Sequence, residues 1–415
     1  MNNVSVNNNL QSFAYYCRMN VDAVIIGGGA CGLMCAVQAG YLGKSTVLIE
    51  HIDKVGAKIL ISGGGRCNYT NLYTSDANFI SNNEHFVKSA LSQWSVDDTI
   101  QFFEMFGIDG QEKTLGQLFP SSNKASDIVN GFVNLINELG QEILTNTNVL
   151  EIRKMDEGFE VDINNRGTKK TIVTNNVVIA TGGLPIPKMG ATDFAFQVAK
   201  QFDIKITKTA PALVPLVIGH KDREWFEKMS GTSVHSIVSN DEISFEENIL
   251  FTHWGLSGPA ILQISSYWRA PKPIYINFLP HQSIRKLIEE TRQSNGKKLL
   301  QNFLGVFLPN KLCEAMSVYL PYDVNLASLS NIQLELIENT IHHFEVLPAG
   351  DKGYEKAEVM RGGVDTNELS SKSLEAKKVE GLFFGGECVD VTGWLGGYNF
   401  QWAWACGYVI AQNLH

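Results

Sequence analysis

Near the start of the chain, three closely spaced glycines and one carboxylate have the spacing of a nucleotide-binding site. Gly27, Gly29 and Gly32 form a G-x-G-x-x-G pattern, and Glu50 follows about 20 residues later. In this pattern the first glycine permits a tight turn, the second lets the backbone approach a pyrophosphate, and the third lets a helix pack on a strand. The carboxylate can accept hydrogen bonds from ribose hydroxyls. We expect a dinucleotide to contact Gly27, Gly29, Ala30, Cys31, Gly32 and Glu50.

The residues around this motif predict the elements that must position it. Residues 22–26 are apolar and rich in β-branched side chains, residues 33–42 favour a helix, and residues 45–49 form a second apolar run that ends at Glu50. The helix N-terminus would direct N–H groups and a partial positive charge at a phosphate. An ordinary glycine-rich turn is the alternative interpretation.

A second dense segment, residues 54–71, contains three consecutive glycines. We expect a loop with many unshielded backbone donors, in which Lys58 and Arg66 add positive charge for a phosphate or for the pyrimidine edge of a flavin. A flexible surface loop is the alternative, although the flanking Ile/Leu run is unlike a linker. The candidate ligand-binding residues here are Lys58, Ser62, Gly63, Gly64, Gly65, Arg66, Cys67 and Asn68.

A third glycine-rich segment, residues 381–407, lies at the other end of the chain. A short apolar run, residues 382–384, ends at a Gly-Gly-Glu sequence, and more glycines precede a helix whose N–H groups can stabilise negative charge on a reduced flavin ring. A glycine-rich loop before a terminal helix is the alternative. The two ends of the chain make sense together if both enclose one large cofactor, which we predict to be FAD. The candidate residues are Gly386, Glu387, Gly396, Gly397, Tyr398, Asn399 and Gln401.

The segment between the ends predicts further elements of one cofactor-binding domain. Apolar alternation at residues 149–152, 159–163 and 171–173 predicts a small antiparallel meander, with Val149 near the adenine. Residues 177–179 then predict a separate buried strand that ends in an Ala-Thr-Gly-Gly turn. This turn is expected to close over the cofactor with Ala180, Thr181, Gly182 and Gly183, a plain strand and turn being the alternative.

Helices and an insertion are also expected. Residues 95–106 and 126–139 have helical spacing, each opened by a serine in the N-cap position. From about residue 190 to 343 the character changes: residues 212–218, 233–238 and 274–279 predict strands, whereas residues 283–319 and 329–343 predict helices. This region has no second G-x-G-x-x-G unit, so we expect NAD(P)H, if used, to dock transiently in the flavin cleft.

Within this insertion, His253 is the candidate catalytic residue, because a histidine near neutral pKa can donate or accept a proton beside a flavin. A histidine that only holds its loop is the alternative. Ser257 is expected near a helix N-cap and Pro259 in the first turn. His342 and His343 are adjacent and would diverge on a helix, so no metal site is expected.

Composition favours a globular enzyme of two or three domains. The chain has 415 residues, of which 44% are hydrophobic and 19% charged, and its net charge of −9 argues against a nucleic-acid partner. The absence of a long apolar stretch argues against membrane insertion, so we expect a cytoplasmic protein. Seven cysteines, an odd number at irregular spacing, favour reduced thiols over disulfides. Nothing in the sequence determines the oligomeric state.

Three motifs together resemble one known family. Residues 58–71, 251–259 and 385–399 are similar to the HI0933-like family of bacterial flavoproteins, and the resemblance covers nearly the whole chain from residue 21. It implies a glutathione-reductase-type FAD fold, bound non-covalently to its cofactor and interrupted by an inserted domain. In related enzymes an acidic residue at the position of Glu387 binds the ribityl chain. Members are described as NAD(P)/FAD-dependent oxidoreductases, and relatives include an aminoacetone oxidase and a bile-acid enone reductase.

We therefore expect an α/β protein with a Rossmann-like FAD domain and an inserted β-rich domain carrying a small helical cap. The expected function is an FAD-dependent oxidoreductase that moves a hydride between flavin N5 and a small organic substrate. An oxidase and an NAD(P)H-dependent reductase of a conjugated carbonyl both fit, and a non-catalytic flavin-binding regulatory protein is a further alternative. The expected parts are a disordered extension at residues 1–20, FAD-binding segments at 21–189 and 346–415, and the insertion at 190–345 with a helical subdomain near 283–343.

Overall fold

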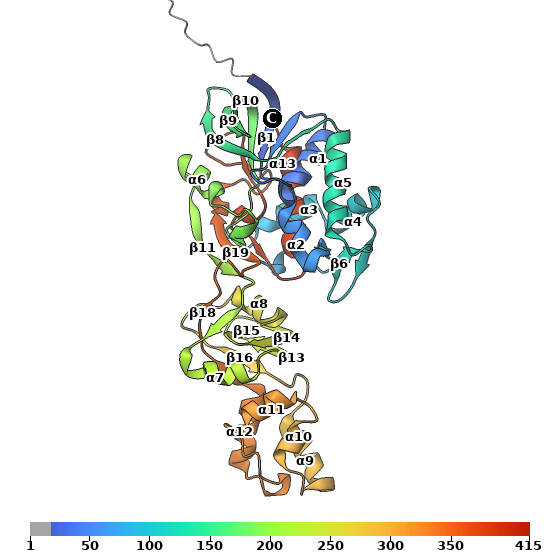
Figure 1. The fold of residues 1–415 in the computed structure, drawn as a ribbon, viewed down its shortest axis with the longest axis vertical. Helices are drawn as coiled ribbons and strands as arrows, with labels where there is room; N and C mark the ends of the chain where they lie inside the picture. Colours follow the sequence, from blue (N-terminus) through green and yellow to red (C-terminus); the bar gives the residue numbers. More distant parts are fainter. Residues whose placement is uncertain (1–17) are drawn as a thin grey trace, which may run out of the picture.

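Residues 18–415 are described by the structure, a computed structural model of the chain. Figure 1 shows an elongated molecule in which a larger α/β body is followed by a β-rich body and then by a group of short helices. The expected extension at residues 1–20 lies largely outside the described residues. Residues 18–20 correct that expectation, because they pair with β10 (Thr168–Ile179) and form the start of strand β1 (Arg18–Ile26).

A parallel sheet forms the centre of the larger body. At one edge, β7 (Glu142–Leu144) pairs with β2 (Thr46–Ile49), and β2 pairs with β1. On its other side β1 pairs with β10, and β20 (Leu382–Phe384) pairs with the end of β10. Residues 23–26 of β1 and all of β2 and β20 are buried. The strands predicted at 22–26 and 45–49 are confirmed, and β1 extends further toward its N-terminus. Strands that are covered on both faces have continuous apolar sequences, which is why the apolar runs predicted them.

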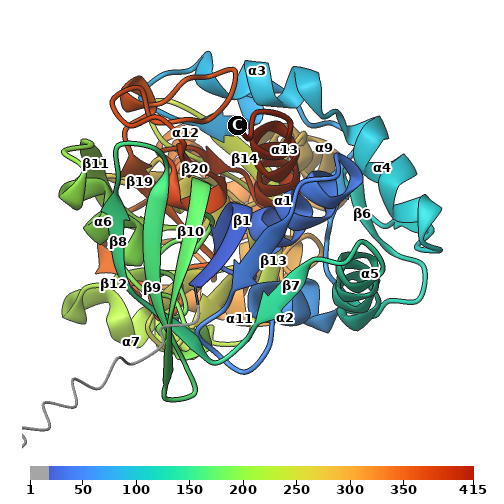
Figure 2. The ribbon, with the colours of Figure 1, turned by 90° about the horizontal axis from the view of Figure 1, so that it is seen from above.

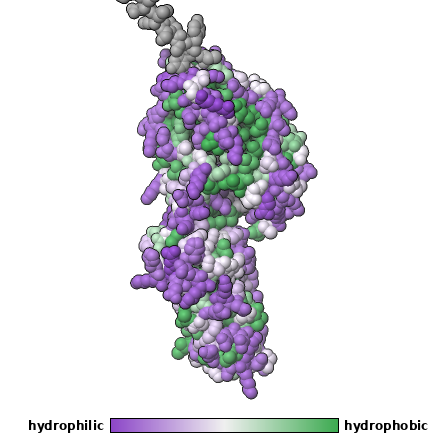
Figure 3. All heavy atoms as spheres, in the orientation of Figure 1, coloured by the Kyte–Doolittle hydropathy of each residue, from purple (hydrophilic) through white to green (hydrophobic). Residues whose placement is uncertain are grey.

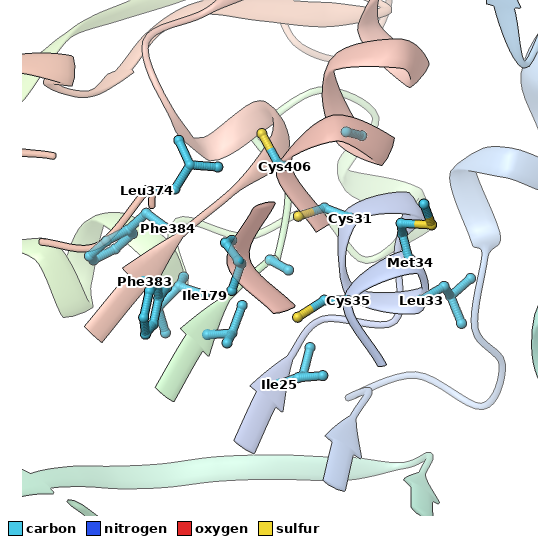
Figure 4. Close-up of a cluster of buried hydrophobic side chains, with 14 of the residues drawn as sticks. Ile25, Cys31, Leu33, Met34, Cys35, Ile179, Leu374, Phe383, Phe384 and Cys406 are labelled. Atoms are coloured by element: carbon cyan, nitrogen blue, oxygen red, sulfur yellow. The ribbon is translucent and has the colours of Figure 1, made fainter. Parts of the chain in front are cut away.

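Two helices from opposite ends of the chain pack together on this sheet. Figure 2 shows α1 (Ala30–Tyr41) beside α13 (Tyr398–Gln412), and Figure 4 shows side chains of α1, α13 and the strands meeting in one buried cluster. The helices approach so closely that a Cβ atom at Gly407 would lie 2.5 Å from the Cys31 carbonyl oxygen. The six cysteines of the described chain are all buried and free. The first and last segments of the sequence therefore share one core.

The expected meander and the expected buried strand are one continuous element. Strands β8 (Thr147–Lys154) and β9 (Phe159–Asn165) pair antiparallel with each other, and β9 pairs with the first half of β10. The second half of β10 continues between β1 and β20. The separation predicted between residues 173 and 177 is wrong, because β1 pairs with both halves of β10 and holds them in one line.

Helices and a small sheet cover the remaining sides of this body. Helix α4 (Val96–Met105) begins after Ser95, whose hydroxyl accepts a hydrogen bond from the Asp98 backbone, as predicted. Helix α5 (Ala125–Glu138) has Lys124 rather than Ser126 at its N-cap, because Ala125 is already helical and buried. The other elements are α2 (Ala57–Gly65), α3 (Phe86–Gln93), β3 (Thr70–Asn71), β4 (Phe79–Ile80), β5 (Gly110–Glu112), β6 (Gln117–Pro120) and β21 (Thr392–Gly393).

The second body is built on an antiparallel sheet of seven strands in the order β17-β16-β13-β14-β15-β12-β18. The predicted strands at 233–238 and 274–279 are present, but the strand predicted at 212–218 is interrupted, because Leu213 has a left-handed backbone with φ +47°. Its elements are β12 (Leu216–Ile218), α7 (His220–Lys228), β13 (Ser233–Ser239), β14 (Ser244–Thr252), β15 (Gly255–Ser257), α8 (Pro259–Ser265), β16 (Ile274–Asn277), β17 (Phe344–Val346) and β18 (Pro348–Asp351).

Four short helices continue from this sheet, at the far end of the molecule in Figure 1. They are α9 (Ile284–Asn295), α10 (Leu300–Leu304), α11 (Asn310–Met316) and α12 (Asn331–His342). Their buried residues belong to the same hydrophobic cluster as the seven-stranded sheet. The helices predicted at 283–319 and 329–343 are thus confirmed, but the first of these two segments contains three helices.

Two strands connect the bodies. Strand β11 (Ile206–Ala212) leaves the larger body after α6 (Phe194–Gln201), and β19 (Val359–Val364) returns to it, and the two strands pair antiparallel. Each body has its own hydrophobic cluster. On the face in Figure 3, hydrophobic atoms gather in the middle of the larger body. Within residues 18–415, no helix has the length and apolar character that a membrane crossing requires.

Candidate active site

A cavity of about 880 Å³ lies at the carboxyl edge of the parallel sheet, at the upper end of the usual range for small-molecule and cofactor sites. Its walls come from the turn after β1, from α2, from the end of β10 and from the C-terminal glycine segment. The second body contributes Leu213, Glu247 and Pro259. The predicted site residues that line it are Gly27, Gly29, Ala30, Cys31, Glu50, Lys58, Ser62, Gly63, Gly64, Arg66, Asn68, Val149, Ala180, Thr181, Gly182, Gly386, Glu387, Gly396, Gly397 and Asn399.

The turn after β1 has the geometry that the glycine pattern predicts. Gly27 has φ +110°, and a Cβ atom there would lie 2.5 Å from the Ala180 carbonyl oxygen. Gly29 is the N-cap of α1. A Cβ atom at Gly32 would lie 2.0 Å from the Gly27 carbonyl oxygen, so Gly32 serves helix packing and lies outside the cavity wall. The turn thus brings its backbone and the N-terminus of α1 to the cavity wall, where a pyrophosphate could be held.

Glu50 is held at one end of the cavity by three hydrogen bonds. Its carboxylate accepts from the Gly28 backbone N–H at 2.9 Å and from the Ile52 N–H at 3.1 Å, and it pairs with His51 Nδ1 at 2.8 Å. Burial opposes ionisation, but the hydrogen bonds from His51, Ile52 and Gly28 outweigh it and lower the pKa of Glu50. The same contact with Glu50 raises the pKa of His51. The sequence patterns did not mark His51 as a site residue, although its position directly after Glu50 could have indicated it.

Two buried polar atoms on the cavity wall lack a hydrogen-bond partner among the described residues. They are Asn68 Oδ1, beside Gly397, and the hydroxyl oxygen of Thr181. An unpaired buried polar group costs free energy, so such atoms indicate a missing ligand. Both residues were predicted to contact the cofactor. The residues present therefore fit a large polar cofactor such as FAD.

The triple-glycine segment has the non-helical backbone of the expected loop, although it directly follows the helical turns at the start of α2. Helix α2 leaves helical geometry at Ser62, and Gly63 and Gly64 have φ values of +55° and +70°. Cys67 is fully buried, and burial raises the pKa of its thiol to about 12, so it contacts protein rather than the cavity. Gly65 also lies outside the cavity lining. The kink turns the backbone of Ser62 to Gly64 toward the cavity.

One ion pair joins two predicted site residues that are far apart in sequence. Lys58 Nζ lies 2.8 Å from Glu387 Oε2, and Glu387 Oε1 accepts a hydrogen bond from the Met360 backbone N–H at 3.2 Å. Gly183 does not line the cavity but lies behind it, where a Cβ atom would be 2.8 Å from Met360 Sδ. The ion pair ties α2 to the C-terminal segment and leaves less free positive charge on Lys58 than we expected.

At the start of α13 the structure separates ligand-facing residues from structural ones. Gly396, Gly397 and Asn399 line the cavity, whereas Tyr398 and Gln401 do not. Gln401 is fully buried, accepts hydrogen bonds from the hydroxyls of Thr70 and Thr99, and donates to two backbone carbonyl oxygens. Consecutive helical residues point in different directions, which is why the prediction fails for Tyr398 and Gln401.

The predicted catalytic histidine is not at the cavity. His253 lies exposed in the turn between β14 and β15, is absent from the cavity lining, and packs against Trp254 with ring centroids 4.0 Å apart. The alternative interpretation, a residue of the loop itself, fits this position. Gly258 rather than Ser257 is the N-cap of α8, and Pro259 is its first residue, as predicted.

Two carboxyl groups that the sequence did not suggest lie at the junction of the two bodies. Glu247, on β14, and Glu358, just before β19, both line the cavity. Glu358 is accessible from the cavity but surrounded by protein, and this desolvation raises the pKa of its carboxyl group. Desolvation also raises the pKa of Glu247. No motif marks an isolated glutamate in a strand, so only the tertiary structure could identify them.

The parallel sheet, the glycine turn and the cavity with its unpaired polar atoms define a flavoprotein of the FAD-dependent oxidoreductase class. A family model described as the HI0933-like protein Rossmann domain matches residues 21–413, and the chain belongs to this family of FAD-binding flavoproteins.

Similarity to individual proteins extends over nearly the whole chain. It is 43% identical over 396 residues to the "Ribosomal RNA dihydrouridine synthase" of Escherichia coli strain K12, covering 95% of this chain and 98% of that one. It is 27% identical to the "3-dehydro-bile acid delta(4,6)-reductase" of Clostridium scindens, covering 94% and 97%. Among solved structures, a 3-ketosteroid-delta4-(5alpha)-dehydrogenase from Rhodococcus jostii RHA1 has the same fold, with a TM-score of 0.51 at 12% identity and coverage of 97% and 99%.

Proposed function

We propose that this chain reduces a uridine of ribosomal RNA to dihydrouridine. The observation that carries the proposal is the 43% identity to the Escherichia coli rRNA dihydrouridine synthase, which extends over 95% of this chain. Because the match covers 95% of this chain, it includes the insertion as well as the FAD domain. The proposal replaces two expectations, a small organic substrate and the exclusion of nucleic acid that was drawn from the net charge. Such a substrate would place the protein in the cytoplasm.

The chemistry of this substrate matches a reductase of conjugated carbonyls. The C5–C6 double bond of uracil is conjugated with the C4 carbonyl, so a hydride added at C6 leaves negative charge that the carbonyl oxygen can accept. A proton then adds at C5, and the product differs from uridine by one hydrogen molecule. The relative named as a bile-acid delta(4,6)-reductase is 27% identical, and by its name it too reduces a carbon–carbon double bond. One cavity could thus serve either substrate class.

The residues that would hold FAD follow from the site geometry. The turn at Gly27 and Gly29 would hold the pyrophosphate, and Glu50 would bind the ribose hydroxyls. Asn68 Oδ1 would accept a hydrogen bond from the cofactor, and the Thr181 hydroxyl would donate or accept one. When bound and reduced, FAD supplies the hydride. The electrons would come from NAD(P)H, which must use the same cavity transiently, because residues 18–415 form no second dinucleotide-binding unit.

A proton donor is also needed, and we assign this role to Glu358. A carboxyl group with a raised pKa retains its proton closer to neutral pH and can act as a general acid. Glu358 is also well fixed: its backbone N–H donates to the Leu213 carbonyl oxygen at 3.1 Å, and the nearby Met360 N–H donates to Glu387. Glu247, which the second body contributes, is the other candidate.

Anaerobic reoxidation of the flavin separates the two substrate classes. The purified protein, loaded with FAD and reduced by NADPH, is mixed with ribosomal RNA transcribed in vitro or with a steroid enone. We expect the flavin to be reoxidised by the RNA, and mass spectrometry to find uridines that have gained one hydrogen molecule. Reoxidation by the enone but not by the RNA would overturn the proposal in favour of a small-molecule enone reductase.

A further inference from the structure

Beside the cavity mouth, a small sheet carries a surface that continues outward from the cavity wall. Strand β3 pairs with β6, which pairs with β5, and the loops of this sheet include residues 72–74 and 113–116. We name the side chains of Arg66, Leu72, Tyr73, Lys113, Leu115 and Phe119 the rim patch.

The rim patch is attached directly to the cavity wall. Arg66 and Phe119 are themselves part of the lining. The Asn71 side-chain amide donates hydrogen bonds to the Leu115 carbonyl oxygen at 3.0 Å and to the Gly396 carbonyl oxygen at 2.8 Å. Because Gly396 also lines the cavity, the patch is fixed beside the opening and a polymer that enters the cavity must pass near it.

Two cations of the patch share one aromatic ring. Arg66 Cζ lies 5.3 Å and Lys113 Nζ 4.4 Å from the centroid of the Phe119 ring. Among residues 18–415, neither cation forms an ion pair with a carboxylate: Arg66 donates to the Gly63 carbonyl oxygen and Lys113 to the Asn123 side chain. The carboxylate of Glu112, in the same sheet, instead accepts a hydrogen bond from the Gly116 N–H.

These contacts leave positive charge uncompensated. Desolvation and the nearby charge of Arg66 together lower the pKa of Lys113. In a chain whose net charge is −9, such a local cluster attracts a negatively charged ligand and can orient it.

The loops of the same sheet carry exposed apolar side chains. Tyr73 is 65% exposed, Leu115 58% and Leu72 40%. The Tyr73 ring lies against Gly116, where a Cβ atom would be 2.7 Å from a ring carbon. The Leu72 backbone N–H also donates to the Gly116 carbonyl oxygen at 2.8 Å. An exposed aromatic ring on a small sheet that also carries cations is the combination that single-stranded nucleic acids bind.

We propose that the rim patch binds the unpaired RNA strand on either side of the reacting uridine, with Arg66 and Lys113 contacting phosphates and Tyr73 stacking on a neighbouring base. The proposal rests on the proposed function. A base inside a helix cannot reach a buried flavin and must leave the stack, so the flanking strand must be held outside the cavity. The patch offers phosphate and base contacts at that place.

Two substitutions test this, Lys113→Ala and Tyr73→Ala, because neither residue lines the cavity. Lys154→Ala is the matched control: Lys154 Nζ lies 4.6 Å from the Phe159 ring centroid, in a similar cation–aromatic pair on β8, which Figure 1 shows on the opposite side of the larger body from β6. Binding of a fluorescent unpaired rRNA fragment to the FAD-loaded proteins is measured against salt concentration, together with dihydrouridine formation.

We expect each patch variant to bind RNA about five- to tenfold more weakly, as loss of one stacking or phosphate contact would cause. Lys113→Ala should also reduce the salt dependence of log K by about 0.7, whereas Lys154→Ala should change neither quantity. The flavin spectrum and the rate of flavin reduction by NADPH should stay at wild-type values, which shows that the variants are folded and the cavity intact.

Three results would overturn the inference in distinguishable ways. If the wild-type protein forms dihydrouridine and both patch variants bind RNA as the wild type does, the patch has no role although the proposed function holds. If the wild-type protein reduces an enone but neither binds nor reduces rRNA, the proposed function fails first. If Tyr73→Ala dissociates a dimer in sedimentation while RNA binding is unchanged, the patch is a contact between copies of the chain.

Discussion

Two sets of carboxyl groups on the cavity wall have surroundings that differ in kind. Glu50 is buried but accepts two backbone hydrogen bonds and pairs with His51, so its pKa is lowered. Glu358 and Glu247, at the junction of the bodies, are desolvated without such compensation, so the pKa values of both are raised. The same chemical group therefore has its pKa shifted down at one place and up at the other.

Under the proposed function, this difference divides the cavity into a part that binds the cofactor and a part that reacts. An ionised, rigidly held carboxylate suits hydroxyl groups that do not react, such as those of a ribose. A carboxyl group that retains its proton suits proton transfer. The division coincides with the architecture, because Glu50 follows a strand of the parallel sheet, whereas the other two lie where the inserted sheet meets it.

The largest expected effect is at the reacting part. Glu358→Gln should lower the turnover of the reduced enzyme with its substrate by about a hundredfold to ten-thousandfold, the usual contribution of a general acid. FAD affinity should not change, because the glutamine keeps the shape of the side chain. Stopped-flow reoxidation of the reduced flavin measures this step directly.

Glu247→Gln provides the matched comparison from the opposite wall, with an expected loss below about tenfold. A large loss for Glu247→Gln together with a small one for Glu358→Gln would transfer the proton-donor role to the inserted body.

The next effect is at the binding part. Glu50→Gln removes the charge that strengthens hydrogen bonds to the cofactor, and FAD affinity should fall by about tenfold to a hundredfold. Glu375→Gln is the control, because Glu375 also accepts from a backbone N–H, that of Gly381 at 2.7 Å, and pairs with His415, but it lies outside the cavity lining. Equal losses in both variants, measured by flavin fluorescence titration, would contradict a direct role for Glu50.

A smaller effect is expected at Thr181, where one substitution should change stability and FAD affinity in opposite directions. Thr181→Val removes a buried hydroxyl that lacks a partner in the described chain, so the cofactor-free protein should be slightly more stable while FAD affinity falls by about fivefold to tenfold. Thr366→Val, at another unpaired hydroxyl away from the cavity, should raise stability without changing FAD affinity. Melting temperatures without FAD and titrations with FAD test the pair, and unchanged affinity in Thr181→Val would contradict a contact.

The smallest effect is the pH dependence of the Glu50–His51 pair. The lowered pKa of Glu50 contributes stability that is present above its ordinary value of 4.5 and is lost as pH falls through the folded value. The raised pKa of His51 contributes stability that is present below its ordinary value of 6.5 and is lost as pH rises through the folded value. His51 is 41% exposed, so solvent screening keeps its share below about 1 kcal/mol. Comparison of wild type with His51→Gln in thermal unfolding across this pH range should show a difference that shrinks at alkaline pH.

Local patterns in the sequence were sufficient for the cofactor and much of its binding site. The glycines after β1 and the carboxylate after β2 have roles that depend on backbone geometry within a few residues, and these roles are encoded by residue type and spacing. The same holds for Asn68 and Thr181, each of which lies beside a glycine-rich turn. The apolar runs predicted most strands for the same reason, since burial on both faces leaves a continuous apolar signature.

Where a site depends on which way a side chain points, or on contacts between distant segments, the sequence was insufficient. Gln401 and Asn399 are two residues apart on α13, yet one bonds inside the core and the other lines the cavity. His253 had the right chemistry but lies on an exposed turn, whereas Glu358 became a candidate acid only when the return strand placed it at the junction. Desolvation is produced by atoms from the whole fold, so the tertiary structure alone decided which carboxyl groups have a raised pKa.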